Sequence, residues 1–282
     1  MDKADLHIHT TASDGKSSPE EILALADRMK LACIAITDHD TLDGYREAKE
    51  LSGDYEVELI PGIEITAGWE GRECHLLAYA FDPAHESMAG LCRRHRRARL
   101  ERGKWIIEQL SREGIDLDIE EVKVEASWGN IGRPHIASLL VKKGYVASPR
   151  EAFIRYLGDH ALGPIENDYF DFAEAVRRVK EAGGAAVLAH PGKLYSPHER
   201  RELAGLGLDG IEVIHPSHDW ETQKELESFA EQQDLLVTGG SDFHGEADGY
   251  HGRFGVVAVA RSHADRLQRL AASRQPEPAE QP

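Results

Sequence analysis

The feature that most constrains the fold of this chain is a repeated order of buried strand, polar loop and helix. The apolar run Ala32–Thr37 ends at Asp38, and a predicted helix over Leu42–Leu51 and a predicted strand over Val57–Thr66 follow it. Short apolar strands that alternate with helices are typical of a parallel sheet whose outer face is covered by helices. The sequence therefore predicts an α/β protein that is built on a parallel sheet or barrel.

Local signals give the approximate bounds of further elements. Ser18, Pro19 and Glu21 stand where the N-cap, the first turn and the capping box of a helix require them, so a helix is predicted to begin there. Apolar runs and helical periodicity place the other elements. Strands are predicted over Ala4–His9, Arg72–Phe81, Ala185–Ala189, Gly210–Ile214, Leu235–Thr238 and Gly255–Ala260, and helices over Phe172–Ala182, Glu199–Leu206, Trp220–Gln233 and Ala264–Ala271.

The central part of the chain, from about residue 84 to residue 166, breaks this order. A long helical stretch runs through Leu110, and shorter helices are predicted around Glu120, over Arg133–Lys143 and over Pro149–Leu157. We expect residues 1–83 and 167–272 to form the barrel and residues 84–166 to form a helical insert that caps a substrate site. Residues 273–282, which are rich in Pro and Glu, are expected to be disordered.

Composition excludes several classes of function. The 282 residues carry 33 basic and 50 acidic side chains, and a formal charge of −17 repels long polyanions such as duplex DNA. No run of eighteen apolar residues occurs, and the chain enters a strand-like segment at once, so neither a membrane span nor a signal peptide is expected. Three cysteines fit a reducing compartment, and we expect a cytoplasmic protein.

Histidine and carboxylate side chains gather where the predicted strands end. His7 and His9 share one face of a strand, as do Asp242 and His244, because side chains alternate along a strand. Six successive strand ends deliver such residues, and buried imidazoles and carboxylates need partners. We therefore favour metal binding over a metal-free polar network. The candidate ligands are His7, His9, Asp14, His39, Glu64, His75, His190, Asp242 and His244.

This ligand set indicates more than one metal ion. Nine donors exceed what a single ion with four to six ligands can use. Nitrogen and oxygen donors without a thiolate suit Mn²⁺, Fe²⁺ or Zn²⁺. Glu64 is the natural bridge, because one carboxylate can offer an oxygen to each of two ions. Clustered divalent ions leave positive charge at the mouth of the site, and phosphate is the usual anion for such a site.

The segments around these residues resemble the motifs of a known family, the PHP superfamily of polymerase and histidinol phosphatase metallophosphoesterases. The resemblance spans almost the whole chain except the helical middle and the tail. It implies a distorted (β/α)7 barrel with a trinuclear metal site, for which three divalent ions, Mn²⁺ first among them, are expected. The segments are Asp5-Leu6-His7-Ile8-His9-Thr10 with Ser13-Asp14-Gly15, Thr37-Asp38-His39-Asp40-Thr41, Pro61-Gly62-Ile63-Glu64, Ala189-His190-Pro191 and Gly240-Ser241-Asp242-Phe243-His244.

The resemblance also implies a role for each ligand position, and no position is missing. Asp38 and Asp40 have no ligand role in that scheme and are expected to orient neighbouring imidazoles. By analogy with the family, His7, His9, Glu64 and Asp242 would hold one ion, Glu64, His75 and His190 a second, and Asp14, His39 and His244 a third.

Within the superfamily the chain is most similar to the 3′,5′-nucleoside bisphosphate phosphatases, a group that includes bacterial 5′→3′ exoribonucleases. The helical insert and the segment Gly132–Ala137 carry this similarity. Arg133 and His135 begin a helix, where a guanidinium and backbone N–H groups suit a phosphate, although a capping or ion-pair role would also explain Arg133. Lys193 and His218 are further candidate substrate contacts, and His215, which follows a barrel strand, is a candidate catalytic residue and proton donor.

The expected activity is metal-dependent hydrolysis of adenosine 3′,5′-bisphosphate to 5′-AMP and phosphate, in which Glu64 and Asp242 act through the metal ions. Short 5′-phosphorylated RNA is a possible longer substrate. The basic run Arg93–Lys104 would contact such an RNA or form a solvated helix face. Two alternatives stay open at this point: a histidinol-phosphate phosphatase, and a non-catalytic metal-binding or polymerase-associated module.

Overall fold

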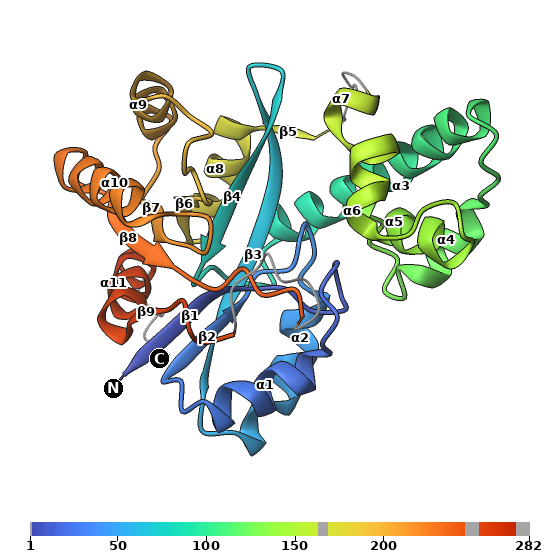
Figure 1. Ribbon diagram of the computed structural model, residues 1–282. Coiled ribbons are helices and arrows are strands. Elements are labelled where there is room, and N and C mark those ends of the chain that lie inside the picture. The colour runs from blue at the N-terminus through green and yellow to red at the C-terminus, as the bar shows by residue number, and fades with distance from the viewer. Residues whose placement is uncertain (1, 163–168, 246–253, 275–282) are drawn as a thin grey trace.

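A strongly curved sheet forms the centre of the protein, as the computed structural model in Figure 1 shows for residues 2–162, 169–245 and 254–274. Neighbouring strands follow the order β8-β7-β6-β4-β3-β2-β1-β9, and β5 pairs with β3 beside this path. The strands are β1 Lys3–Ile8, β2 Cys33–Ile36, β3 Glu58–Trp69, β4 Arg72–Tyr79, β5 Phe170–Asp171, β6 Ala185–Leu188, β7 Gly210–Ile214, β8 Leu236–Gly239 and β9 Val259–Ala260.

The sheet curls until its two ends meet, which confirms the predicted barrel-like α/β fold. A β-bridge joins Ile8 at the end of β1 to Phe243, which follows β8. The His9 N–H also donates to the Phe243 carbonyl oxygen at 2.9 Å. The carboxyl ends of the first and last long strands therefore lie side by side.

Two strands run against the direction that the sequence pattern predicts. β4 is antiparallel to both β3 and β6, and β9 is antiparallel to β1, so the barrel-like sheet is mixed and not parallel throughout. The physical reason lies in the short turn at Glu70 and Gly71, both with positive φ, which folds β3 and β4 into a hairpin and leaves no room for a crossover helix. This hairpin projects beyond the barrel at the top of Figure 1.

Amphipathic helices cover the outside of the sheet, and their starts follow the predicted capping signals. The Ser18 Oγ accepts a hydrogen bond from the Glu21 N–H at 3.2 Å, and a Glu21 carboxylate oxygen accepts one from the Ser18 N–H at 2.8 Å. These helices are α1 Pro19–Arg28, α2 Asp43–Leu51, α8 Phe172–Glu181, α9 Pro197–Gly205, α10 Trp220–Gln232 and α11 Arg261–Ala272, with a 3₁₀ turn at Ser52–Asp54.

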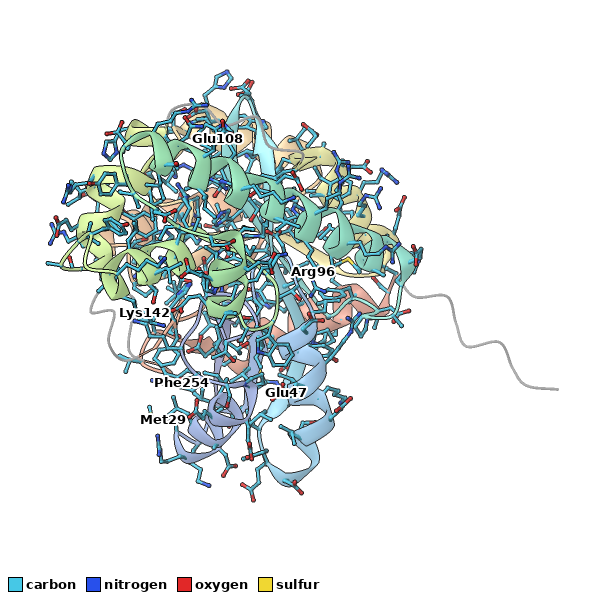
Figure 2. The ribbon with its side chains drawn as sticks, turned by 90° about the vertical axis from the view of Figure 1, so that its right-hand side faces the viewer. Met29, Glu47, Arg96, Glu108, Lys142 and Phe254 are labelled. Atoms are coloured by element: carbon cyan, nitrogen blue, oxygen red, sulfur yellow. The ribbon has the colours of Figure 1, made fainter. Side chains whose placement is uncertain are left out.

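Between β4 and β5, all the regular elements that the structure describes are helices, and turns and loops join them. This segment packs around its own apolar cluster, which includes Ile106, Leu110, Ile136, Leu140 and Leu157. Figure 2 shows the long helix α3, which carries Arg96 and Glu108, crossing from the barrel toward these smaller helices. The segments are α3 Glu86–Arg112, α4 Ile119–Glu125, α5 Arg133–Lys142, α6 Pro149–Ala152, a π-helical turn Phe153–Leu157 and α7 Asp159–Leu162.

Three further predictions concern particular stretches of the chain. In the part that the structure describes, no helix combines the length and apolarity needed to cross a membrane. Residues 275–282 of the predicted tail lie outside the described residues. The domain bounds at residues 84 and 166 stay predictions.

Gly240 is the residue on which closure of the barrel depends most directly. An added Cβ at this position would lie 2.3 Å from the His7 nitrogen and 2.6 Å from the His7 Cβ. Backbone cannot yield as a flexible side chain does, so β1 and the segment after β8 would have to separate.

We expect Gly240→Ala to lower the free energy of unfolding by about 1–3 kcal/mol, the usual cost of overpacking. Denaturant unfolding of the purified protein measures it. The matched control is Gly205→Ala in α9, where a Cβ meets nothing within 4 Å, and this change should be neutral or slightly stabilising. Equal stability of the two variants would contradict the close approach of β1 and Gly240.

Candidate metal centre

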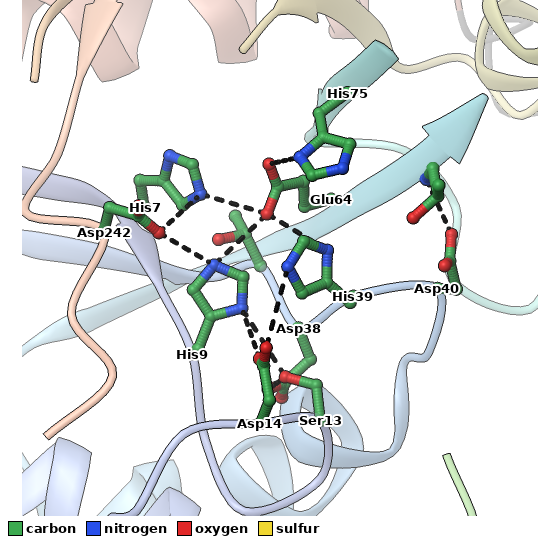
Figure 3. A network of polar contacts seen from close by, with 12 residues as sticks. His7, His9, Ser13, Asp14, Asp38, His39, Asp40, Glu64, His75 and Asp242 are labelled. Atoms are coloured by element: carbon green, nitrogen blue, oxygen red, sulfur yellow. Dashed lines mark hydrogen bonds and ion pairs between the residues drawn. The ribbon is translucent and has the colours of Figure 1, made fainter. Parts of the chain in front are cut away.

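Glu64 lies at the centre of a cluster of imidazoles inside the barrel mouth (Figure 3). Its side chain is 1% exposed, and five histidine nitrogens approach its two carboxylate oxygens. The distances are 3.3 Å from His7 Nε2, 3.2 Å from His9 Nε2, 3.3 Å from His39 Nδ1, 2.9 Å from His75 Nδ1 and 2.9 Å from His190 Nε2.

The structure brings all nine predicted ligand residues into four overlapping groups. In each group the donor atoms lie within 4.8 Å of one another. The first group holds the three residues expected at the third ion, together with His9. The groups are His9, Asp14, His39 and His244; His7, His215 and Asp242; His7, Glu64 and His190; and His39, Glu64 and His75.

His215 belongs to this cluster although the sequence predicts only a catalytic role for it. Its Nε2 lies 3.3 Å from Asp242 Oδ2. Its Nδ1 accepts a hydrogen bond from the backbone N–H of Ser217 at 3.1 Å, so the neutral ring carries its proton on Nε2. His215 is therefore a hydrogen-bond donor toward Asp242 in this arrangement.

Several donor atoms in the cluster fit metal ions better than they fit one another. His9 Nε2, Asp14 Oδ1 and His39 Nδ1 are buried and make no hydrogen bond within the described residues. Each lies beside a group that offers nitrogen or oxygen lone pairs, and a divalent cation would satisfy them together. Buried polar atoms without partners are costly, so this donor set fits resident divalent ions.

The backbone is strained at two of the ligand positions. His190 has φ +25° and Asp242 has φ +49°, and residues other than glycine rarely adopt positive φ values. Such conformations cluster at functional sites because the surrounding structure enforces them.

Burial and neighbouring charge act in opposite directions on the titratable groups. Burial raises the pKa of Glu64, but the surrounding histidines outweigh it and hold that pKa well below its usual range. Burial lowers the pKa of His75 and His244, but Glu64 and Glu73 at one site and Asp14 and Asp242 at the other raise both pKa values to about 10. At His39 burial dominates and lowers the pKa to about 3.

Asp38 and Asp40 hold loops in place. Asp38 accepts hydrogen bonds from the Thr10 N–H at 2.7 Å, the Thr10 hydroxyl at 2.7 Å and the Ser13 hydroxyl at 2.6 Å, which shapes the loop before Asp14. Asp40 accepts from Arg99 Nε at 2.7 Å and from the Thr66 N–H at 2.7 Å. Its partner is thus a helix α3 guanidinium, and Figure 3 shows Asp40 apart from the ligands.

A cavity of about 140 Å³ opens between the ligand cluster and the helical segment. Asp14, His39 and His75 of the ligand cluster line it. Arg99, Arg102 and Arg133 line it too, together with Ile106, Ile131 and Phe153. The cavity therefore joins ligand residues to three guanidinium groups.

Arg133 is the one predicted substrate contact that lines this cavity. Its Nη2 lies 3.7 Å from Glu73, which also accepts a hydrogen bond from Arg102 at 2.8 Å. Arg99 and Arg102 were predicted only as members of the basic run, as RNA contacts or as part of a solvated helix face, and Glu73 was given no role. Glu73 and His75 are two residues apart and therefore share one face of the predicted strand. That spacing was the sequence signal that could have placed Glu73 near the site.

The other predicted substrate residues make different contacts. His135 Nδ1 accepts a hydrogen bond from the Gly132 N–H at 2.9 Å, which caps α5. Lys193 is exposed and pairs with Asp219 at 3.1 Å. His218 is buried and hydrogen-bonds the Val213 carbonyl oxygen at 2.8 Å, with its ring 5.2 Å from that of His215.

Most of the basic run on α3 is paired within the protein. Arg94 and Arg178 both lie over the Phe170 ring, at 4.2 and 4.5 Å. This pattern favours the solvated and packed helix face over an RNA-binding stripe. The ion pairs are Arg93 with Glu86, Arg96 with Asp43, Arg99 with Asp40, Arg102 with Glu73, and Lys104 with Glu101.

A barrel with clustered histidines and carboxylates at one mouth is an architecture that can hold metal ions. The PHP domain signature matches residues 5–128. The chain is 34% identical to a 5′-3′ exoribonuclease of Haemophilus influenzae, over 86% of this chain and 90% of that protein. It is also 33% identical to a phosphoribosyl 1,2-cyclic phosphate 1,2-diphosphodiesterase of Eggerthella lenta, over 90% and 95%. The chain therefore belongs to the PHP family, which confirms the resemblance seen in its motifs.

Two further similarities agree with this assignment. The chain is 30% identical to a 3′,5′-nucleoside bisphosphate phosphatase of Chromobacterium violaceum, over 88% of this chain and 90% of that protein. A solved structure from Bifidobacterium adolescentis, assigned as a metal-dependent phosphoesterase, superposes with a TM-score of 0.87 at 33% identity, over 95% of this chain and 96% of that one.

Metal loading is expected to release protons from the site. His75 and His244, with pKa values of about 10, are protonated near neutral pH in the metal-free protein, and a ligand nitrogen must lose its proton to bind a cation. Raising the pH from about 6 to about 8 should therefore tighten Mn²⁺ binding. Calorimetric titrations in buffers of different ionisation enthalpy measure the protons released, and an unchanged affinity with no release would contradict these charge states.

Proposed function

We propose that this protein is a metal-dependent phosphoesterase that removes the 3′-phosphate from nucleoside 3′,5′-bisphosphates, with short 5′-phosphorylated RNA as a longer substrate. The observation that carries the proposal is the cavity itself, in which Asp14, His39 and His75 face Arg102 and Arg133. One end can hold a phosphate through cations and the other through guanidinium forks. A ribose with a phosphate group on each side would span these two ends.

The names of two relatives support a substrate of this kind. A nucleoside 3′,5′-bisphosphate and a phosphoribosyl 1,2-cyclic phosphate both contain a ribose that carries two phosphate groups. The third name, an exoribonuclease, describes cleavage of a ribose–phosphate chain. A cyclic phosphodiesterase is therefore the second candidate function, because that relative matches over almost its whole length.

In the proposed reaction, each group of residues would have a role that follows from its position. Divalent ions bound by the ligand cluster neutralise phosphate charge and lower the pKa of a water molecule. His215 holds a proton on Nε2 at the edge of the cluster, where a leaving sugar oxygen would need one. Arg102 and Arg133 orient the second phosphate, and the apolar side chains Ile106, Ile131 and Phe153 limit the water in the cavity. We propose residues 84–166 as the substrate cap for this reason, and three Mn²⁺ ions as the resident metals.

The first experiment compares four substrates with manganese-loaded protein. Adenosine 3′,5′-bisphosphate, a 5′-phosphorylated oligoribonucleotide, 5-phosphoribosyl 1,2-cyclic phosphate and histidinol phosphate are assayed side by side for phosphate or product release. The proposal expects the highest kcat/KM with the bisphosphate and 5′-AMP as its product. A preference for the cyclic phosphate would select the second candidate, and a preference for histidinol phosphate would overturn both.

Arg133→Gln tests the guanidinium end of the cavity. Removing a charge-assisted phosphate contact that is made equally in the ground and transition states should raise KM about 10-fold with little change in kcat. Arg150→Gln is the matched control, because Arg150 is an exposed arginine of the same helical segment and does not line the cavity. If both variants gave wild-type KM values, Arg133 would be an ion-pair residue for Glu73 only.

A further inference from the structure

Glu212 contacts two of the predicted metal ligands, His7 and His190. It lies in the middle of β7, is 0% exposed, and has no ligand role in the PHP scheme. One carboxylate oxygen, Oε1, lies 3.0 Å from His7 Nδ1. The other, Oε2, accepts a hydrogen bond from the backbone N–H of His190 at 2.7 Å. A single carboxylate therefore contacts the end of β1 and the turn after β6.

The contact with His7 determines which ring nitrogen faces the cluster. An ionised carboxylate only accepts hydrogen bonds, so the proton of the His7 ring lies on Nδ1. A neutral ring, which is the form that binds a metal ion, then has its lone pair on Nε2. This atom lies 3.3 Å from Glu64 Oε2 and 3.3 Å from Asp242 Oδ1, inside the ligand cluster.

The contact with His190 holds an unfavourable backbone conformation. His190 has φ +25°, and it is the turn at this residue that brings its Nε2 to 2.9 Å from Glu64 Oε1. A strained turn persists only when surrounding contacts enforce it. The charge-assisted hydrogen bond that the His190 N–H donates to Glu212 is such a contact, because it fixes the backbone of the strained residue itself.

We infer that Glu212 is a positioning residue that orients two ligands for metal binding: His7, whose Nε2 lies beside Glu64 Oε2, and His190, whose Nε2 lies beside Glu64 Oε1. Outer carboxylates that orient metal-ligating histidines commonly change metal affinity by 10- to 100-fold. The inference rests on metal binding by the proposed enzyme and not on the identity of its substrate.

Glu212→Gln tests this role because the amide keeps the size of the side chain but offers only one acceptor oxygen. If that oxygen accepts from the His190 N–H, the amide NH₂ faces His7 and favours the ring form with its proton on Nε2, which cannot bind a metal. We expect Mn²⁺ affinity, measured by calorimetry without substrate, to fall about 10- to 100-fold.

The matched control is Thr238→Val, which changes a buried polar residue directly opposite Glu212 on β8. This variant should bind Mn²⁺ as the wild type does. Circular dichroism and gel filtration of the metal-free proteins show whether each variant is folded. A folded Glu212→Gln protein with wild-type affinity would overturn the inference, whatever substrate the enzyme prefers.

A second measurement needs only the wild-type chain. Long-range ¹H–¹⁵N spectra of the zinc-loaded protein with ¹⁵N-labelled histidine identify the protonated nitrogen of each ring, and the His7→Gln variant assigns the His7 signals. The inference expects a protonated Nδ1 and a metal-bound Nε2 at His7. Metal binding through Nδ1 would overturn it even if Glu212→Gln failed to fold.

Discussion

The rest of this structure depends on one constraint: an ionised group buried in a protein interior must have its charge and its hydrogen bonds satisfied. The described part of the barrel mouth holds buried carboxylates that meet this demand without occupying a ligand position. Asp5 is an example, since it accepts hydrogen bonds from the N–H groups of Ser241 at 2.8 Å and Gly255 at 3.0 Å. Burial nevertheless raises the pKa of Asp5 to about 6. Asp38, Asp40 and Glu212 secure other loops in the same way. The hydrogen bonds that satisfy these buried carboxylates therefore also hold the loops in position.

The antiparallel hairpin gives the site two residues that a parallel strand would place elsewhere. Thr66 on β3 pairs with His75 on β4, so His75 stands beside the strand that carries Glu64. Glu73, two residues earlier on the same face, reaches outward to Arg102 and Arg133. One strand therefore supplies both a metal ligand and the carboxylate that organises the guanidinium end of the cavity. Because the connection between β3 and β4 is short, β4 lies where its residues Glu73 and His75 line the same cavity as residues of α3 and α5.

The sequence predicts secondary-structure elements and the residues of the clustered site well where the determining interaction is local, and it predicts strand direction poorly because that depends on distant partners. The capping box at Ser18 and the apolar run of β7 are readable because their partners lie a few residues away. The ligand residues stand out because His and Asp recur with period two at strand ends. The direction of β4, by contrast, depends on which strands it pairs with, and periodicity carries no information on that. Glu212 escaped notice for a related reason: it is an isolated charged residue in an ordinary strand, and its partners lie on distant segments. Arg99 was recognised only as a member of the basic run, and its partner Asp40 is likewise distant in the sequence.

An acidic protein can bind a doubly phosphorylated ligand because its local charge differs from its net charge of −17. The exposed Arg93 and Arg96 on α3 pair with Glu86 and Asp43, so this surface offers little to a long polyanion. Inside the barrel mouth the balance is set by imidazoles around Asp14, Glu64 and Asp242. Protons on His75 and His244 neutralise these carboxylates in the metal-free protein, and divalent cations would replace those protons with a larger charge at the same place. In the proposed enzyme the same exchange would stabilise the site and attract phosphate. Metal binding and substrate binding would then be coupled through the charge of a single carboxylate-centred cluster.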